Sequence, residues 1–211
     1  MKTKDKILHA SLEAFCEFGV AQVSTNHIAD ILDLSPGNVY YYFKNKQALV
    51  DELYGCFITD FVGFLQGGGK RVDSPARVWL VLSLCFQLMI KYRFVFRDAN
   101  YVASKYPELR KRFNEVIYET RAAGDSFCQQ LIDCGLMVAA PGEVNRLATN
   151  LHLVFTQWIT YVEFLPFDRG RIRSDADPYR ISQGIQQIVD LIFPYLDEDA
   201  REVFLAVDTS A

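Results

Sequence analysis

The stretch TNHIADILDLSPGNVYYYFKNK, residues 25–46, predicts two short helices joined by a tight turn. In its first part, Ile28, Ile31 and Leu32 stand three and four positions apart, which puts them on one face of a helix. The turn is expected at residues 33–35, where a polar Asp-Leu-Ser run interrupts the apolar spacing. The stretch therefore predicts a compact helical pair rather than a strand or a loop.

Hydroxyl side chains mark the beginning of both predicted helices. Ser24 or Thr25 can accept a hydrogen bond from the first turn of the first helix. Ser35 stands in the same position before the second helix, and Pro36 follows it. Proline suits the first helical position because its missing N–H would have no partner there.

The second helix has a narrow inner face. Val39 and Phe43 lie four positions apart and are expected to point inward. The remaining side chains are polar, aromatic or very small, a set that a buried helix would not carry. They are Gly37, Asn38, Tyr41 and Tyr42, which are expected to project outward, and Tyr40, which is expected beside the inner face.

A short outward-facing helix after a tight turn has the form of a DNA-binding helix-turn-helix. Gly37 would let the backbone approach base edges, and Asn38 can offer a donor and an acceptor to adenine. The tyrosine hydroxyls and Lys46 can hold phosphates. Two short helices joined by a turn are also common as plain structure, so the residues in front of this stretch are needed to decide between a nucleic-acid contact and a structural helix pair.

Residues 3–49, TKDKILHASLEAFCEFGVAQVSTNHIADILDLSPGNVYYYFKNKQAL, resemble the amino-terminal domain of the TetR family of bacterial transcriptional regulators. The resemblance consists of a first helix that ends at Phe18-Gly19, a T-x-x-I-A segment from Thr25, and S-P-G-x-x-Y-x-x-F-x-x-K. Asp33 stands where the family usually has glycine, and Asp tolerates the left-handed conformation better than most residues. No basic residue flanks Thr25, which weakens the expected phosphate grip there.

The resemblance implies a set of DNA-contacting residues in the first quarter of the chain. Within it, one group is expected at the phosphates and another nearest the bases. The phosphate group is Thr25, Tyr41, Tyr42 and Lys46, with Asn26 beside Thr25; the base group is Pro36, Gly37, Asn38 and Tyr40.

Composition limits the possible classes of protein. The chain has 211 residues, half of them hydrophobic, and a net charge of −4, which indicates a globular protein and announces no nucleic-acid partner. The first 50 residues are neutral in lysine and carboxylate count, which argues against strong non-specific DNA binding. Any DNA contact must therefore come from local geometry.

The sequence predicts neither an enzyme nor a metal or cofactor site. It lacks a G-x-S-x-G elbow and an H-E-x-x-H pair. His9, His27 and His152 have no carboxylate or cysteine at ligand spacing, so no metal is expected. The five cysteines form no C-x-x-C pair and are expected to be buried, reduced thiols.

No segment resembles a signal peptide, and the apolar runs are shorter than the roughly 18 residues that span a bilayer. A cytoplasmic protein without a membrane partner is expected. We predict an all-α fold, with an N-terminal three-helix helix-turn-helix domain at residues 1–47 and a larger helical domain for ligand binding and dimerisation at 48–211. The glycine run 67–69 is expected to be a connector, because it lacks phosphate-loop spacing.

Helical periodicity predicts the elements themselves. The expected helices cover residues 3–18, 46–65, 76–92, 94–105, 107–134, 141–164, 178–195 and 198–206, besides the two short helices of the helix-turn-helix.

The helices expected at residues 141–164 and 178–195 are apolar on more than one face. They can pair with the same two helices of a second copy, as a four-helix bundle in a symmetric homodimer, or lie wholly within a monomer core. Sequence alone leaves both interpretations open, and palindromic DNA recognition favours the dimer. The residues expected at the interface are Leu151, Val154, Trp158, Ile181, Ile185, Ile188 and Ile192.

Large aromatic side chains are frequent in the middle of the chain, and some can line a cavity between helices. The candidates for a pocket are Trp79, Phe86, Phe94, Tyr101, Phe113, Tyr118, Phe155 and Trp158.

The resemblance thus predicts a homodimeric repressor that binds a palindromic double-stranded DNA operator and is released by a small apolar or amphipathic effector. The alternative is a helical small-molecule-binding protein without specific DNA binding. The neutral charge of the first 50 residues and the departures around Thr25 keep this alternative open.

Overall fold

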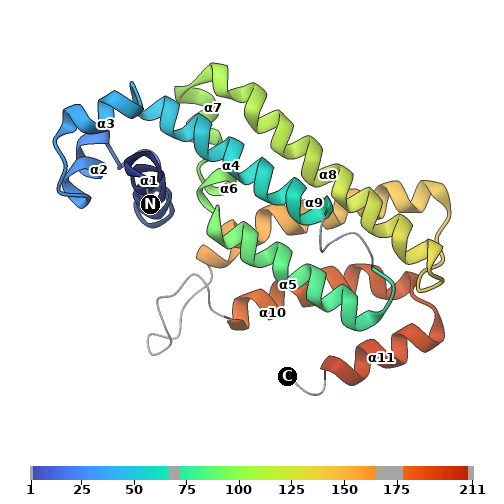
Figure 1. Cartoon of the computed structure of the whole chain (residues 1–211). Helices are drawn as coiled ribbons and strands as arrows, with labels where there is room; N and C mark the ends of the chain where they lie inside the picture. Colours follow the sequence, from blue (N-terminus) through green and yellow to red (C-terminus); the bar gives the residue numbers. More distant parts are fainter. Residues whose placement is uncertain (1, 67–71, 165–177, 209–211) are drawn as a thin grey trace. The chain divides into compact units, whose positions relative to one another are not determined.

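The computed structural model describes residues 2–66, 72–164 and 178–208 (Figure 1). The predicted connector at residues 67–69 lies outside these ranges. Within them the chain forms helices and no strand, which confirms the predicted all-α class. No described helix combines the length and apolarity needed to cross a membrane.

The helices follow one another in the order predicted from periodicity. They are α1 (Thr3–Phe18), α2 (Thr25–Ile31), α3 (Pro36–Tyr42), α4 (Lys46–Gln66), α5 (Pro75–Lys91), α6 (Phe94–Arg97), α7 (Ala99–Lys105), the 3₁₀ helix η1 (Pro107–Leu109), α8 (Arg110–Asp133), α9 (Pro141–Glu163), α10 (Pro178–Ile192), the 3₁₀ helix η2 (Phe193–Tyr195) and α11 (Glu198–Asp208).

Periodicity missed three helix breaks, the last of them the 3₁₀ helix η2 at the end of the helix expected at residues 178–195. The helix expected at residues 94–105 is two helices, α6 and α7, because the backbone of Asp98 leaves the helical region with φ −97° and ψ 9°. The helix expected from residue 107 begins with the 3₁₀ turn η1. The apolar spacing continues across these breaks, so the spacing could not reveal them.

The chain divides into two compact units, each with most of its contacts within itself. Unit 1 combines Met1–Asp60 with Lys91–Ile117, and unit 2 combines Phe61–Ile90 with Tyr118–Ala211. Helices α4, α5 and α8 each contribute residues to both units. This division follows contacts along and across helices, and the functional boundary expected after residue 47 stays a prediction.

The core of unit 1 joins the first three helices to residues that follow much later in the sequence. Ile7, Ile28 and Val39 are fully buried on α1, α2 and α3 respectively. The Phe94 ring lies 5.7 Å from that of Phe15 and 5.8 Å from that of Tyr54, measured between centroids. Aromatic pairs at such distances stabilise a core beyond their buried area.

Two large apolar residues at helix ends are exposed. Phe18 is 48% exposed and Ile31 is 49% exposed, so the expectation that Ile31 faces inward is wrong. Each is the last residue of its helix, Phe18 of α1 and Ile31 of α2.

Unit 2 is organised around the packing of α10 on α9 and α5. Gly184 of α10 makes this possible, because a Cβ there would lie 2.7 Å from atoms of Phe86 and of Trp158. Ile185, Ile188 and the other buried residues of α10 belong to the same hydrophobic cluster. The helices thus approach at a point where only a hydrogen fits.

Candidate nucleic-acid interface and ligand cavity

The link between α2 and α3 is a tight turn in which Asp33 adopts a left-handed conformation, with φ 52°. The Leu34 N–H donates to the Ala29 carbonyl at 2.9 Å and closes the turn. At the start of α2, the Ser24 hydroxyl accepts from the His27 N–H at 3.1 Å. Of the two residues predicted to cap α2, Ser24 does so, and Asp33 adopts the left-handed conformation that the family's usual glycine would favour.

Helix α3 begins at Pro36 as predicted, but the capping role expected of the Ser35 side chain is wrong. The Ser35 carbonyl, not its hydroxyl, accepts from the Asn38 N–H at 2.9 Å. Val39 is fully buried and Phe43 is 4% exposed, so these two residues hold α3 against unit 1 as expected.

The outer face of α3 is exposed to solvent in the protomer. Tyr40, Tyr41 and Tyr42 are 66%, 81% and 40% exposed, and Pro36, Gly37 and Asn38 are exposed too. The Tyr41 and Tyr42 rings meet edge to face at 5.0 Å between centroids, which orders two phenol groups at the surface. All predicted base-contacting residues therefore lie together on one short helix.

Gly37 has no packing reason to be glycine. A Cβ there would meet only the Ser35 hydroxyl oxygen, at 3.8 Å, an ordinary contact. Since glycine costs a helix about 0.5–1 kcal/mol relative to alanine, a surface glycine at this point points to a need outside the chain. On α2, Asn26 is exposed and Thr25 is half-buried, so both can reach a partner that contacts this unit.

Lys46, expected at a phosphate, uses its ammonium within the chain. Its Nζ donates to the Val20 carbonyl at 2.7 Å and lies 5.9 Å from the centroid of the Tyr101 ring. Burial and the charge of Lys105 lower the pKa of Lys46. Three donors leave the ammonium able to bind a phosphate as well, and this role stays a prediction.

The other lysines of the first 50 residues are either paired within the chain or exposed to solvent. Lys4 pairs with Glu52 at 2.7 Å, whereas Lys2, Lys6 and Lys44 are exposed. The surface around α3 thus offers few cations for phosphates, in keeping with the neutral charge of the first 50 residues.

Sequence reasoning missed the residues that hold the end of α1. The Arg97 guanidinium donates to the Phe15 carbonyl at 2.6 Å and to the Cys16 carbonyl at 2.8 Å. It also pairs with Asp98 at 3.1 Å, and the Asp98 carboxylate accepts from the Val20 N–H at 2.9 Å. A cation at the carbonyl end of a helix is favoured by the helix dipole. We call Arg97 and Asp98 the α1 clamp.

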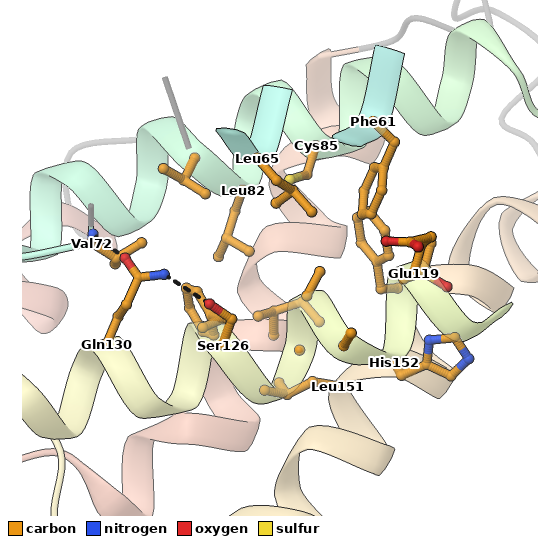
Figure 2. Close-up of a pocket in the computed structure, with 18 residues that line it drawn as sticks. Phe61, Leu65, Val72, Leu82, Cys85, Glu119, Ser126, Gln130, Leu151 and His152 are labelled. Atoms are coloured by element: carbon orange, nitrogen blue, oxygen red, sulfur yellow. Dashed lines mark hydrogen bonds between the residues drawn. The ribbon is translucent and has the colours of Figure 1, made fainter. Parts of the chain in front are cut away.

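A cavity of about 310 Å³ lies within unit 2 (Figure 2). Apolar side chains dominate its walls, and five polar or charged ones, together with the Cys85 thiol, interrupt them. The lining residues are Phe61, Leu65, Val72, Val81, Leu82, Cys85, Glu119, Thr120, Ala122, Ala123, Gly124, Ser126, Phe127, Gln130, Leu151, His152, Phe155 and Ile188. This mixture is typical of small-molecule sites.

Of the aromatic residues predicted for a pocket, Phe155 lines this cavity and the others lie elsewhere. Phe86 is buried in the core of unit 2, with Trp79 and Trp158 partly buried against it. Phe94, Tyr101 and Phe113 belong to unit 1, and Tyr118 is 75% exposed. The walls of this cavity also include small residues of α8, Ala122, Ala123 and Gly124, which a prediction based on large aromatic side chains leaves out.

The predicted dimer residues also need correction. Leu151, Ile185, Ile188 and Ile192 are at most 4% exposed and form part of the core of unit 2, so they are not surface residues. Val154, Trp158 and Ile181 are half-buried. The apolar residues exposed along α9 and at its C-cap follow another stripe, with Leu153 54%, Tyr161 56% and the C-cap Phe164 83% exposed. Along α9, the exposed stripe lies one residue position before the predicted one, on a neighbouring face of the helix.

Histidine and cysteine need one correction each. His9 lies 3.3 Å from the Glu13 carboxylate, so the expectation of no carboxylate near a histidine was wrong, although the pair is exposed. No group of three potential metal ligands occurs among the described residues. Cys16, Cys85 and Cys128 are buried free thiols, whereas Cys134 is exposed and Cys56 is half-buried.

Family models match both parts of the chain. The model described as "Bacterial regulatory proteins, tetR family" matches residues 7–53, and that described as "Bacterial transcriptional repressor" matches residues 65–204. The chain is 31% identical to a TetR-family transcriptional regulator from Marinobacter aquaeolei VT8, whose crystal structure superposes with a TM-score of 0.85. The match covers 100% of this chain and 98% of the other.

Curated relatives match over shorter ranges. The "Probable HTH-type transcriptional regulator YttP" of Bacillus subtilis (strain 168) is 26% identical over 46% of this chain and 51% of its own length. The "HTH-type transcriptional regulator QacR" of Staphylococcus aureus is 40% identical over 25% of this chain and 28% of its own. The chain spans about half the length of the first of these and less of the second.

The fold and the exposed α3 define a helix-turn-helix protein with a separate helical body. With family models covering most of its length, the chain belongs to the TetR family of bacterial transcriptional regulators. Regulators of this family are transcription factors rather than enzymes, which agrees with the prediction from sequence.

Proposed function

We propose that this regulator represses transcription by binding a palindromic operator as a homodimer, and that a small effector in the unit 2 cavity releases it. The observation that carries the proposal is the outer face of α3, which has no role in the packing of the protomer. Glycine, asparagine and three tyrosines are exposed together there. Such a face suits the major groove, where small and hydrogen-bonding residues read bases.

We call the helix-turn-helix domain, which was predicted at residues 1–47, the head. In this proposal the head of each protomer binds one half-site of the operator. Asn38 and the backbone at Gly37 contact bases, while Thr25, Tyr41, Tyr42 and the lysines contact phosphates. Contacts to bases set sequence preference, and contacts to phosphates set affinity and its salt dependence.

Dimerisation is proposed through the exposed stripe of α9. Leu153, Gln157, Tyr161 and Phe164 follow one another at spacings of four, four and three, and all four are exposed in the protomer. Three of the four are large apolar or aromatic residues, and such residues gathered on one helix face are unusual on a monomer surface. Pairing of this face with the same face of a second copy would bury it around a two-fold axis, as a palindrome requires.

Effector release needs a connection between the cavity and the head. Helix α4 supplies one by chain continuity, because it begins at Lys46 and carries Phe61 and Leu65 of the cavity wall. A ligand that favours one arrangement of α4 would change the separation of two heads in a dimer. Effector and operator must then weaken each other's binding by the same factor.

Selection from a pool of genome-derived short duplexes, at about 150 mM salt, tests the proposal. Enrichment of a palindrome supports a dimeric operator reader. Asn38→Ala should then lower the ratio of specific to non-specific binding by about tenfold or more, since a bidentate base contact contributes about 1–3 kcal/mol. Asn114→Ala, an exposed asparagine of α8, is the matched control.

Lys46→Ala tests the predicted phosphate contact separately. If the ammonium touches a phosphate, the variant should weaken binding to all sequences and flatten the salt slope by about one unit per head. A variant that loses only thermal stability would assign Lys46 to the Val20 carbonyl alone.

A second candidate is a helical small-molecule-binding protein without specific DNA binding. The engagement of Lys4 with Glu52 and of Lys46 with Val20 favours it, because both cations are used within the chain. No enrichment of any duplex over bulk DNA would support this candidate.

A further inference from the structure

The polar groups of the cavity fall into two sets. At one end, the Val72 N–H donates to Gln130 Oε1 at 3.0 Å, and Gln130 Nε2 donates to the Ser126 hydroxyl at 3.3 Å (Figure 2). These groups satisfy one another. Since buried polar groups cost free energy only when they lack partners, this end makes no strong demand on a ligand.

The other end carries Glu119 and His152 (Figure 2). His152 is 9% exposed, and its Nδ1 is buried without a hydrogen-bond partner. The ring bonds the backbone of Thr120, the residue next to Glu119, so the two side chains belong to the same end. Because Nδ1 has no partner, we assign the Thr120 bond to Nε2.

The protonation of His152 decides what Nδ1 can do. Burial, and then the charge of Arg121, lower the pKa of His152, against a smaller opposing effect of the Thr120 bond. The ring is therefore neutral at neutral pH. With the Nε2 proton donated to Thr120, Nδ1 presents a lone pair and can only accept a hydrogen bond.

Glu119 gives the cavity its charge. It is the only acidic side chain among the lining residues, which include no lysine or arginine. No ion pair joins Glu119 to another described residue. A carboxylate in a mostly apolar site is stabilised by a cation and opposes a second anion.

We propose that the effector is a small cationic amphipath, with an apolar body and one protonated amine that donates to the Glu119 carboxylate and to His152 Nδ1. The inference rests on the proposed function, because it takes the cavity as the effector site. It disfavours ligands headed by a carboxylate, because at this end they would meet the Glu119 carboxylate and the lone pair of His152 Nδ1.

The size of the cavity limits the apolar body. At roughly 30 Å³ per water molecule, about 310 Å³ corresponds to a ligand on the order of ten to fifteen non-hydrogen atoms. Phenylbutylamine, phenylbutanol and phenylbutyrate fall in this range and differ only in their polar end. They are suitable probes because they hold the apolar contribution constant.

Isothermal titration of the full-length protein without DNA, at neutral pH, compares these three probes. We expect the amine to bind at least about tenfold more tightly than the alcohol, and the carboxylate to bind more weakly than both. Equal affinities, a preference for the carboxylate, or no binding of the amine at millimolar concentration would each overturn the proposal.

Glu119→Gln locates the interaction, since it removes the charge and keeps the shape. We expect it to reduce amine affinity by about tenfold and to leave alcohol affinity within about twofold. Asp133→Asn, on the same helix but outside the cavity, is the matched control. Unchanged amine binding in Glu119→Gln, with an unchanged melting profile, would show that the amine binds elsewhere and would refute the assignment.

Operator binding is measured separately, by fluorescence anisotropy with the selected duplex. Amine binding that releases the duplex supports both the ligand class and the proposed release mechanism. Amine binding that depends on Glu119 but leaves the duplex bound supports the ligand class and overturns the release mechanism. The two proposals therefore fail in distinguishable ways.

Discussion

Gly37 on α3 and Gly184 on α10 are both helical glycines, yet their surroundings are opposite. A Cβ at Gly184 would lie 2.7 Å from Phe86 and Trp158, whereas one at Gly37 would meet a single oxygen at 3.8 Å. Gly184 is therefore required by the packing of unit 2. Gly37 is required by nothing in the protomer, which directs attention to a partner outside it.

The same contrast separates the helices on which these glycines stand. Helix α10 uses its apolar face to fill the core of unit 2, and its predicted interface isoleucines 185, 188 and 192 are buried there. Helix α3 buries Val39 and leaves its polar and aromatic residues in solvent. Packing within unit 2 accounts for the residues of α10, whereas packing within the protomer does not account for the outer residues of α3.

Arg97→Ala is expected to have the largest effect of these variants. It should change both stability and DNA binding, so it does not fit the contrast between residues that serve packing and residues that serve a partner. The variant removes the donors to two α1 carbonyls and leaves the largely buried Asp98 without its cation. We expect a loss of about 2–4 kcal/mol in the free energy of unfolding, measured by urea denaturation.

Arg97→Lys is the control for this variant. It keeps the charge but cannot donate to both carbonyls in the geometry of a guanidinium, so an intermediate loss is expected. If Arg97→Ala unfolds at the same urea concentration as the unmodified protein, the α1 clamp does not stabilise the head.

Gly184→Ala should follow in size and act on stability alone. The new methyl group must displace two aromatic rings that are packed in a core, which costs about 1–3 kcal/mol. Calorimetry should show a lower melting temperature. Operator affinity of the folded fraction should stay within about twofold; a larger loss would mean that this packing also controls the heads.

Much of helix α3 could be predicted from the sequence, because the residues that indicate it lie next to one another. A proline after a serine predicted the start of α3, and two apolar residues four apart predicted its inner face. The resemblance to the TetR family, which usually has glycine at this point of the turn, indicated a left-handed residue at Asp33. The first two of these features depend on residues at most four positions away.

Other parts of the site could not be predicted, because they depend on residues far apart in the sequence. Lys46 meets a carbonyl 26 positions away, and Arg97 meets carbonyls 81 and 82 positions away. The cavity has the same origin, since residues from 61 to 188 line it. Periodicity marks which residues are apolar, but not which gaps between them stay open.

Gly37→Ala sharpens the comparison because its two effects should have opposite signs. Alanine should stabilise α3 by about 0.5–1 kcal/mol, since the site has room for a methyl group. The same methyl group should hinder the approach of the backbone to base edges and weaken operator binding by about tenfold. Melting and anisotropy measurements on one preparation test both effects.

A decrease in stability in Gly37→Ala would contradict the free space around this residue. Unchanged operator affinity would mean that α3 does not approach bases at Gly37, and would leave the exposed face of this helix without its proposed role.

Asp33→Gly should have the smallest effect, because two contributions of similar size oppose each other. Glycine relieves left-handed strain that costs an ordinary residue about 1–2 kcal/mol and an aspartate less. It also adds about 0.4–1 kcal/mol of entropy to the unfolded chain. The net change in the free energy of unfolding should therefore be within about 0.5 kcal/mol of zero. Asp33→Ala gains neither the tolerance of aspartate nor that of glycine and should cost about 1 kcal/mol. Urea denaturation of the pair decides the point: if Asp33→Ala is as stable as Asp33→Gly, the turn between α2 and α3 does not impose a left-handed residue in solution.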